Sequence, residues 1–357
     1  MTDFPILIND NILKVARGQV PSRIPIWIMR QAGRYLPEFR EMRAENDFFK
    51  VCQTPELACE VTLQPIRRFD LDAAIIFSDI LALGLEVQMI PGKGPTFPDP
   101  ITDPASLERI NWNVDVKKEL KYVYEAITMT RIKLEGKVPL IGFSGAPWTL
   151  MTYMIEGGGS TTHSKSKKWL FIYEEESRRL LSLLTKSIIE YLTQQVLAGA
   201  QLLQVFESHA GILGPRLFFK YAMPCLKEIV AGVKENLVKK HSYKTEDLPP
   251  MIVFAKDAHF ALEQLAQIGY EVVGLDWSID RKIAKGIKQS KKISLQGNLD
   301  PCTLYAPDAT LKEETRVMIE ELGSQNYICN LGHGIYPDMD PEKVKTLVDF
   351  VHSIKLE

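Results

Sequence analysis

Eight nearly continuous apolar runs of strand length recur along the chain, and each ends at a polar or glycine-rich turn. They cover residues 24–30, 72–77, 139–145, 200–207, 251–256, 271–277, 293–298 and 327–332. Apolar runs without alternation are typical of strands buried on both faces, as in a parallel sheet. Helical patterns separate the runs, most clearly at residues 179–197, where apolar residues recur at three- and four-residue spacing. Strand followed by helix, eight times over, predicts a (β/α)8 (TIM-type) barrel of the α/β class.

The length of the chain agrees with one such barrel. It has 357 residues, and barrels of about 250 residues with insertions reach this length as one domain. We therefore expect a single catalytic domain over residues 1–357 with an N-terminal extension. An open, doubly wound sheet of eight strands is the structural alternative, although no G-x-G-x-x-G sequence follows the first run to favour it. In a barrel, the carboxyl ends of the strands converge on the face where active sites lie.

Charge and composition restrict the partners of the protein. The net charge of −2 argues against a nucleic-acid or membrane-surface role for the whole molecule, so we expect anions to be bound locally. The sequence has no apolar stretch long enough to span a bilayer, and residues 1–11 resemble neither a secretory signal nor a transit peptide. These features predict a soluble, cytoplasmic protein. Among the five cysteines, Cys52 and Cys59 have a spacing that suits one helix face, and we expect reduced, packed thiols.

The polar residues at the ends of the runs are the candidates for function. The first run ends in Arg30 and Arg34 around a glycine, and such a cationic clamp at a strand end predicts a site for a polyanion. The second run ends in Asp79, and no charge lies between it and Asp72. A carboxylate there is desolvated unless a partner compensates its charge. This favours a functional role for Asp79 over the alternative of a helix cap.

Three further candidates follow later runs. His333 lies between two glycines, which we interpret as a close approach of the backbone to a ligand. Tyr153 and Ser208 fit either a site or the satisfaction of backbone groups. Three more polar residues at the expected barrel mouth are interpreted as structural links without a chemical role, and these are Asp257, His259 and Asp276.

The sequence holds none of the usual signatures of a metal or cofactor site. H-E-x-x-H, C-x-x-C and H-x-C do not occur, and the glycines at residues 157–159 lack the lysine of a phosphate-binding loop. Those glycines indicate a mobile flap or a tight turn. Ser208 and His209 are adjacent, which disfavours a nucleophile–base pair. We expect no metal and no organic cofactor.

Long segments of the sequence resemble the uroporphyrinogen decarboxylase family. Residues 25–34 (PIWIMRQAGR) and 142–157 (GFSGAPWTLMTYMIEG) are similar to its two signature segments, and LDAAIIFSDI, LQVFESHAG, LQGNLDP and NLGHGIYPDMDP are similar to its other strand ends. The resemblance covers residues 4–352. It implies a carboxy-lyase that converts the four acetate side chains of uroporphyrinogen III to methyl groups, giving coproporphyrinogen III in haem biosynthesis. It also implies a homodimer that works without metal or organic cofactor.

The resemblance extends to individual residues. The family's substrate-binding and catalytic residues are matched here by Arg30, Arg34, Asp79, Tyr153, Ser208 and His333. A protonated pyrrole ring can itself accept the electrons of a departing carboxylate, so one buried carboxylate, the role given to Asp79, and several cations for the substrate carboxylates suffice. The proton donor is left open. Arg30 would need an unusual environment or a water molecule, and Tyr153 is a candidate relay.

One departure from the family pattern keeps two alternatives open. After Asp79 the family continues with a Val-Pro-Gln stretch, whereas this chain reaches Gly84 about four residues sooner, a change that closure entropy alone would tolerate. A shortened loop there would fit a catalytically impaired tetrapyrrole-binding protein of the same fold. The other alternative is a corrinoid-dependent methyltransferase of the same superfamily, but its zinc-binding His-x-Cys pair and later cysteine are absent from residues 254–257 and 331–334.

Overall fold

Seven parallel strands form the centre of the protein. The computed structural model describes residues 3–79, 88–90 and 94–356. The strands pair in the order β1-β4-β5-β6-β7-β8-β9, and every pairing is parallel. They are β1 (Ala74–Ile75), β4 (Leu140–Gly145), β5 (Leu202–Glu207), β6 (Met251–Ala255), β7 (Val272–Gly274), β8 (Ser294–Gln296) and β9 (Tyr327–Ile328). Each lies inside one of the predicted runs, so the parallel sheet is confirmed.

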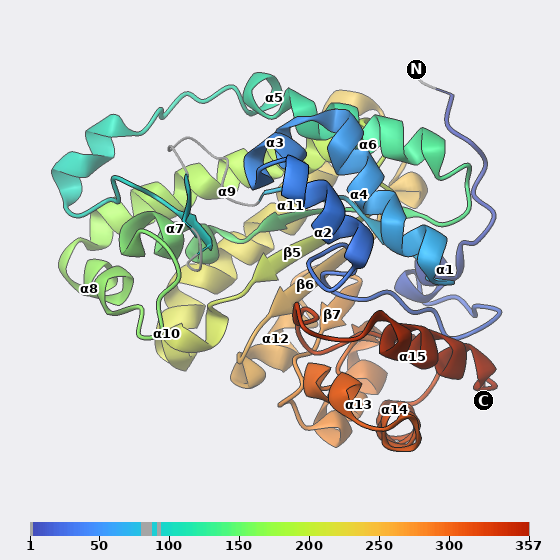
Figure 1. Ribbon diagram of the computed structural model, residues 1–357. Helices are drawn as coiled ribbons and strands as arrows, with labels where there is room; N and C mark the ends of the chain where they lie inside the picture. Colours follow the sequence, from blue (N-terminus) through green and yellow to red (C-terminus); the bar gives the residue numbers. More distant parts are fainter. Residues whose placement is uncertain (1–2, 80–87, 91–93, 357) are drawn as a thin grey trace.

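Helices surround these strands (Figure 1). The helices are α1 (Asn11–Ala16), α2 (Pro37–Glu45), α3 (Phe48–Gln53), α4 (Pro55–Arg68), α5 (Val116–Glu119), α6 (Lys121–Lys133), α7 (Pro147–Glu156), α8 (Ser164–Ile172), α9 (Glu174–Leu197), α10 (Ala210–Leu217), α11 (Met223–His241), α12 (Leu262–Leu265), α13 (Arg281–Lys291), α14 (Asp308–Leu322) and α15 (Pro341–Ser353). The helix predicted at residues 179–197 is confirmed as part of α9. A separate antiparallel pair, β2 (Gln88–Ile90) and β3 (Gly94–Thr96), precedes α5.

The first predicted run, residues 24–30, does not form a regular strand. Only Ile26 makes a bridge, to Cys329, and its carbonyl accepts the N–H of Asp72 at 2.8 Å. Side chains accept some of the N–H groups of this segment, because Ile26 N–H donates to the Asp72 carboxylate at 2.8 Å and Met29 N–H donates to Asn330 Oδ1 at 2.9 Å. The segment still lies between β9 and β1, so it closes the barrel without a continuous ladder.

The core has two layers. Alternate residues of the strands face the barrel interior, where Ile141, Leu202 and Ile252 are fully buried together with Trp27. The intervening residues pack outward against the helices and belong to a second, larger cluster. Helix α1 contributes Ile12 and three further residues to the interior cluster, so it fills one end of the barrel. A filled interior leaves the chemistry to the loops at the carboxyl ends of the strands.

Asp72 joins the two ends of the chain at the barrel seam. Its carboxylate is fully buried and accepts from Asn9 Nδ2 at 2.8 Å, from Arg23 Nη2 at 2.8 Å and from the N–H of Ile26. His352 of α15 also bonds to it, at 2.8 Å. Burial opposes ionisation of Asp72, but these partners outweigh it and lower its pKa. One carboxylate therefore links the N-terminal segment, the closing segment and the C-terminal helix.

The expectation for the cysteines is wrong in one respect. Cys52 lies in α3 and Cys59 lies in α4, because the chain leaves the helix at Thr54 before Pro55 starts the next one. Proline at the first helical position is compatible with a helix start and not with its continuation. All five thiols are free and four are buried, whereas Cys302 is exposed.

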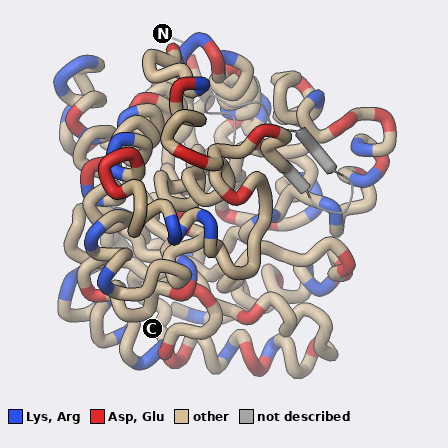
Figure 2. Tube along the Cα trace, turned by 90° about the vertical axis from the view of Figure 1, so that its left-hand side faces the viewer, with Lys and Arg blue, Asp and Glu red and all other residues tan. Residues whose placement is uncertain are grey.

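Charged residues of both signs are interspersed along the chain (Figure 2), in line with the small net charge. Among the residues that the structure describes, none of the helices combines the length and the apolar character needed to cross a bilayer.

Candidate functional site

The turn after residue 29 carries the two candidate arginines. Arg30 has a left-handed backbone (φ 65°), a conformation that costs a non-glycine residue about 1–3 kcal/mol. The turn is held by the hydrogen bond from Met29 N–H to Asn330 and by the N–H of Ile335, which donates to Met29 C=O at 3.0 Å. Arg30 remains exposed, yet desolvation by the surrounding protein lowers its pKa, and the nearby Arg34 lowers it further.

His333 lies beside Arg30, and protein groups lie against the two glycines that flank it. A Cβ at Gly334 would come within 2.3 Å of Arg30 Cδ, and a Cβ at Gly332 would come within 2.3 Å of the Trp277 backbone nitrogen. The glycines thus make room for protein groups on both sides of His333. Desolvation lowers the pKa of His333, and the positive charge of Arg30 acts in the same direction. A neutral imidazole next to a guanidinium results.

Tyr153 connects the arginine turn to Asp79. It lies on α7, which follows β4, and its side chain is half-buried. Desolvation raises the pKa of Tyr153, while the charge of Arg30 opposes the shift and the charge of Asp79 adds to it. A cation and a carboxylate from two other segments therefore both influence the pKa of this phenol.

Asp79 is buried, as its position after an apolar run predicted, with 9% of its surface exposed. Its charge also raises the pKa of two tyrosines, Tyr122 and Tyr191, to which desolvation is the larger contribution. The charge of Asp79 thus acts on three phenolic groups, those of Tyr122, Tyr153 and Tyr191. The helix-cap alternative for Asp79 cannot be compared with the structure because residues 80–87 lie outside the described part of the chain, and so does the shortened loop before Gly84.

Ser208 follows β5 and is half-buried. Its neighbour His209 is the more connected residue. His209 Nδ1 lies 2.5 Å from Thr152 Oγ1, and its ring lies 5.2 Å from the ring of Tyr153 and 4.3 Å from that of His163. Desolvation lowers the pKa of His209 to about 3. The imidazole that packs against the Tyr153 ring is therefore neutral.

The glycines after α7 form a tight turn. Gly157 has a left-handed backbone (φ 84°) and its N–H donates to Tyr153 C=O at 2.9 Å, so it ends the helix that carries Tyr153.

Lys256 is a further cation at the carboxyl ends of the strands, and sequence reasoning gave it no role. Its charge lowers the pKa of both His209 and His333, for which desolvation is the larger cause. Lys256 Nζ pairs with Asp257 at 2.5 Å and lies 5.5 Å from the centre of the Trp277 ring. It could have been found by the rule that identified Arg30, since both cations end an apolar run.

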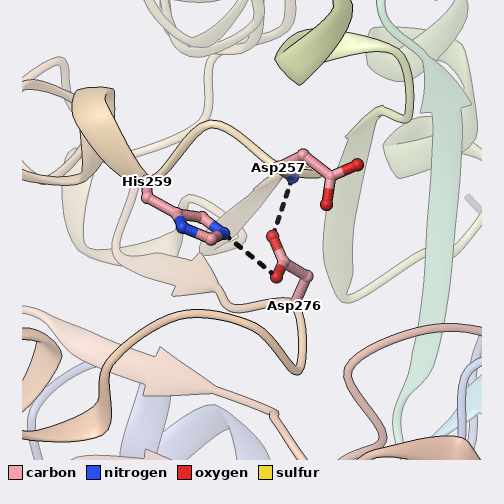
Figure 3. Close-up of side chains that lie close together, drawn as sticks. All are labelled: Asp257, His259 and Asp276. Atoms are coloured by element: carbon pink, nitrogen blue, oxygen red, sulfur yellow. Dashed lines mark hydrogen bonds and ion pairs between the residues drawn. The ribbon is translucent and has the colours of Figure 1, made fainter.

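Asp257, His259 and Asp276 form a polar cluster next to Lys256 (Figure 3). In the described part of the chain, these residues form the only group of three or more potential metal ligands whose ligand atoms all lie within 4.8 Å of one another. Asp276 is already occupied, however, because its carboxylate accepts from Asp257 N–H at 2.7 Å and from the N–H and hydroxyl of Ser278 at 2.9 and 2.5 Å. These bonds join the ends of β6 and β7 and support the interpretation as structural links.

Glu207 is a second buried carboxyl, and sequence reasoning assigned it no role. It ends β5, is fully buried, and its Oε1 accepts a short hydrogen bond from the hydroxyl of Thr149 on α7. Oε2 is buried without a hydrogen-bond partner. Burial raises the pKa of Glu207 to about 8. The available signal was the one used for Asp79, a carboxylate that closes an apolar strand.

The raised pKa of Glu207 gives a testable pH dependence. Between the ordinary value of 4.5 and about 8, the folded state holds a proton that the unfolded state has released. The free energy of unfolding should therefore fall as the pH rises through this window, with a slope of about 1.4 kcal/mol per pH unit from this group. Urea unfolding at a series of pH values should show that Glu207→Gln removes this component. Parallel curves for the two proteins would contradict the prediction.

Solved structures with a similar fold include proteins of another reaction class. A methyltransferase from Methanosarcina mazei superimposes with a TM-score of 0.79 at 20% identity, covering 97% of this chain and 98% of that one. A putative vitamin-B12-independent methionine synthase from Listeria monocytogenes superimposes with a TM-score of 0.54 at 12% identity, covering 99% and 100%. At such identities the likeness concerns the fold alone, and it agrees with the barrel.

Sequence relatives define the family. The profile of Uroporphyrinogen decarboxylase (URO-D) matches residues 7–354. Uroporphyrinogen decarboxylase of Danio rerio is 59% identical, and that of Homo sapiens 56%, each over 98% of this chain and 95% of the relative. The enzyme of Schizosaccharomyces pombe is 50% identical over 98% of both chains. With a match of this extent on top of the barrel and its clustered strand ends, the chain belongs to the uroporphyrinogen decarboxylase family.

Proposed function

We propose that this protein decarboxylates the four acetate side chains of uroporphyrinogen III to give coproporphyrinogen III, without a metal or an organic cofactor. The observation that carries the proposal is the match to uroporphyrinogen decarboxylases, 50–59% identical over 98% of this chain, and the charges of both Arg30 and Asp79 act on Tyr153. A cation, a phenol and a buried carboxylate at one barrel face match the groups that the reaction requires.

Each group has a part in the proposed mechanism. Asp79 accepts hydrogen bonds from the pyrrole N–H groups. It also stabilises the positive charge that develops when the pyrrole ring is protonated at the carbon beside the ring nitrogen. The bond to the acetate carboxyl then breaks, its electrons neutralise the ring, and carbon dioxide leaves. The exocyclic methylene that remains takes up a proton to become the methyl group, and the ring releases the proton that it had gained. Arg30, Arg34 and His333 bind substrate carboxylates. An ion pair at about 4 Å contributes up to roughly 4 kcal/mol at an effective dielectric near 20, before desolvation is subtracted.

The two candidates for the proton donor differ in their surroundings. Desolvation and the charge of Arg34 lower the pKa of Arg30, so its acidity exceeds that of an ordinary arginine. Desolvation raises the pKa of Tyr153, which weakens it as an acid. These opposite shifts favour Arg30 as the source of the proton, with Tyr153 as the group that orients it.

Ser208 and the assembly complete the proposal. Ser208 provides a hydroxyl for the substrate from the end of β5, next to the His209 ring that packs on Tyr153.

We further propose a cytoplasmic homodimer. Sedimentation at several protein concentrations, with one species of twice the chain mass as the expected result, tests the dimer.

The activity is tested by supplying uroporphyrinogen and measuring coproporphyrin after oxidation. Turnover should survive exhaustive chelation and should not increase with added zinc. Product formation that stops after chelation, together with stoichiometric bound zinc, would favour the methyltransferase alternative. Tight binding of uroporphyrinogen without product would favour the impaired tetrapyrrole-binding protein.

The arginines should discriminate by the charge of the substrate. Arg30→Ala and Arg34→Ala should raise KM for uroporphyrinogen more than KM for partly decarboxylated intermediates, because the intermediates have fewer carboxylates to be bound. Lysine at either position should restore binding only in part, since lysine lacks the planar fork of arginine. The comparison uses KM and kcat measured with substrates that carry eight to five carboxylates. The expected loss of binding free energy in each variant is on the order of that of one ion pair.

A control separates this effect from a general loss of charge. Arg316→Ala removes an exposed arginine of α14 that pairs with Glu313 and Glu320, and it should leave both constants unchanged. Equal losses for all substrates in the Arg30 and Arg34 variants would instead assign the two arginines to the fold or to proton transfer.

A further inference from the structure

The start of helix α7 lacks a cap from its own segment. Its N-cap residue is Ala146, whose side chain cannot accept a hydrogen bond, and Pro147 follows at the first helical position. The first N–H groups of a helix need acceptors. Glu207 of β5 places a carboxyl at this end of the helix, where the Thr149 hydroxyl donates to its Oε1.

Further bonds fix the same helix to the same strand end. Ala146 N–H donates to Phe206 C=O at 2.8 Å, and Trp148 Nε1 donates to His209 C=O at 3.1 Å. One turn later, Thr152 Oγ1 lies 2.5 Å from His209 Nδ1. Among these contacts, that of Glu207 is the one made by a fully buried carboxyl.

The helix held in this way carries Tyr153. Thr149 and Tyr153 are four residues apart, so they lie on the same face of α7, one turn from each other. A shift of Thr149 relative to β5 would therefore displace the phenol relative to Arg30 and Asp79. Displacing a catalytic group by about 1 Å can reduce a rate on the order of a hundredfold.

We propose that Glu207 is a positioning residue, which anchors the start of α7 to the end of β5 and thereby sets the place of the Tyr153 hydroxyl relative to Arg30 and Asp79. The inference rests on the proposed function, in which Tyr153 takes part in the decarboxylation. Burial raises the pKa of Glu207 to about 8, so the carboxyl is largely neutral at neutral pH and an amide of the same shape can replace it.

Single variants give the first expectation. Glu207→Ala should lower kcat by roughly ten- to a hundredfold, with a smaller change in KM, because the substrate carboxylates still meet their cations. Glu207→Gln keeps an acceptor for Thr149 and should retain most of the activity. Thr149→Val should resemble Glu207→Ala, whereas Thr149→Ser should resemble the parent. If Glu207→Ala does not fold, the two Thr149 variants carry the test.

A double-mutant cycle with Tyr153→Phe distinguishes positioning from general stabilisation. If Glu207 acts through Tyr153, the loss from Glu207→Ala or Thr149→Val should nearly vanish when Tyr153→Phe is already present. Val344→Ala removes buried volume in α15, far along the chain from α7, and should lower the melting temperature while kcat stays unchanged.

The outcomes separate the two proposals. Additive losses in the cycle, or an undiminished kcat in both Glu207→Ala and Thr149→Val, would overturn the positioning role while leaving the decarboxylase proposal intact. A Tyr153→Phe protein with the kcat of the parent would remove Tyr153 from the proposed mechanism, and the role of Glu207 with it.

Discussion

Replacing Asp79 by asparagine should lower kcat by about a hundredfold or more while the fold is retained, because the loss of one preorganised electrostatic group typically has this effect. The amide keeps the shape of the side chain but cannot stabilise the protonated pyrrole. The carboxylate is buried and its charge acts on Tyr153, so its removal changes the field where the reaction is proposed to occur. Substrate affinity should fall much less, since the cations that bind the carboxylates remain.

The measurement is kcat and KM for uroporphyrinogen, with near-ultraviolet circular dichroism as the check on folding. Asp338→Asn is a suitable control, because Asp338 is an exposed carboxylate that bonds to the Tyr305 hydroxyl at 2.8 Å, and its loss should be silent. An Asp79→Asn protein with kcat within about threefold of the parent would exclude Asp79 from the charge stabilisation expected of it.

Asp72→Asn should destabilise the protein by about 3 kcal/mol, because it removes the charge from a fully buried group that is bonded by four different partners. Asp72 has a lowered pKa in the folded state, so its contribution is present above the ordinary value of 3.8 and is lost as the pH falls through the folded-state pKa. The parent should therefore lose stability on acidification more steeply than the variant does.

Urea unfolding at neutral pH and in acid checks both parts of this prediction. Asp70→Asn is the matched control, because Asp70 contacts Arg23 at 2.8 Å and His352 at 3.4 Å but its side chain is 60% exposed. That variant should change the free energy of unfolding by less than about 1 kcal/mol. Equal effects of the two substitutions would show that burial of Asp72 has no part in closing the barrel.

Much of the architecture was predictable because buried strands of a parallel sheet leave a strong local signal. Continuous apolar runs located all seven strands, although residues 72–77 yielded only the two-residue strand β1. The segment at residues 24–30 has the same apolar pattern without a ladder, since Asp72, Gln31 and Asn330 occupy its N–H groups. Those partners are remote in sequence, apart from Gln31, so no local pattern reveals them.

The candidate site was predictable to a similar degree and for a similar reason. The ends of the strands must converge in a barrel, which brought Arg30, Tyr153 and Asp79 together. The purpose of a glycine depends on what lies opposite it, so sequence alone did not show that Gly334 makes room for Arg30. The role of Glu207 could not be predicted from the sequence, because its partner, Thr149, is a residue of common type on a different element.

The seam at Ile26 also has a consequence for the order in which the protein can form. On one side of the seam, the N–H of Asp72 donates to the Ile26 carbonyl. On the other side, the N–H of Cys329 donates to the Pro25 carbonyl. Pairing with Cys329 joins the first and last parts of the chain, and contacts of such long sequence separation are slow to form. During synthesis the barrel remains open until β9 and α15 have left the ribosome, and the segment at Ile26 and strand β8 present unpaired edges until then. A chain that ends before Tyr327 would keep those edges and should depend on chaperones to stay unaggregated.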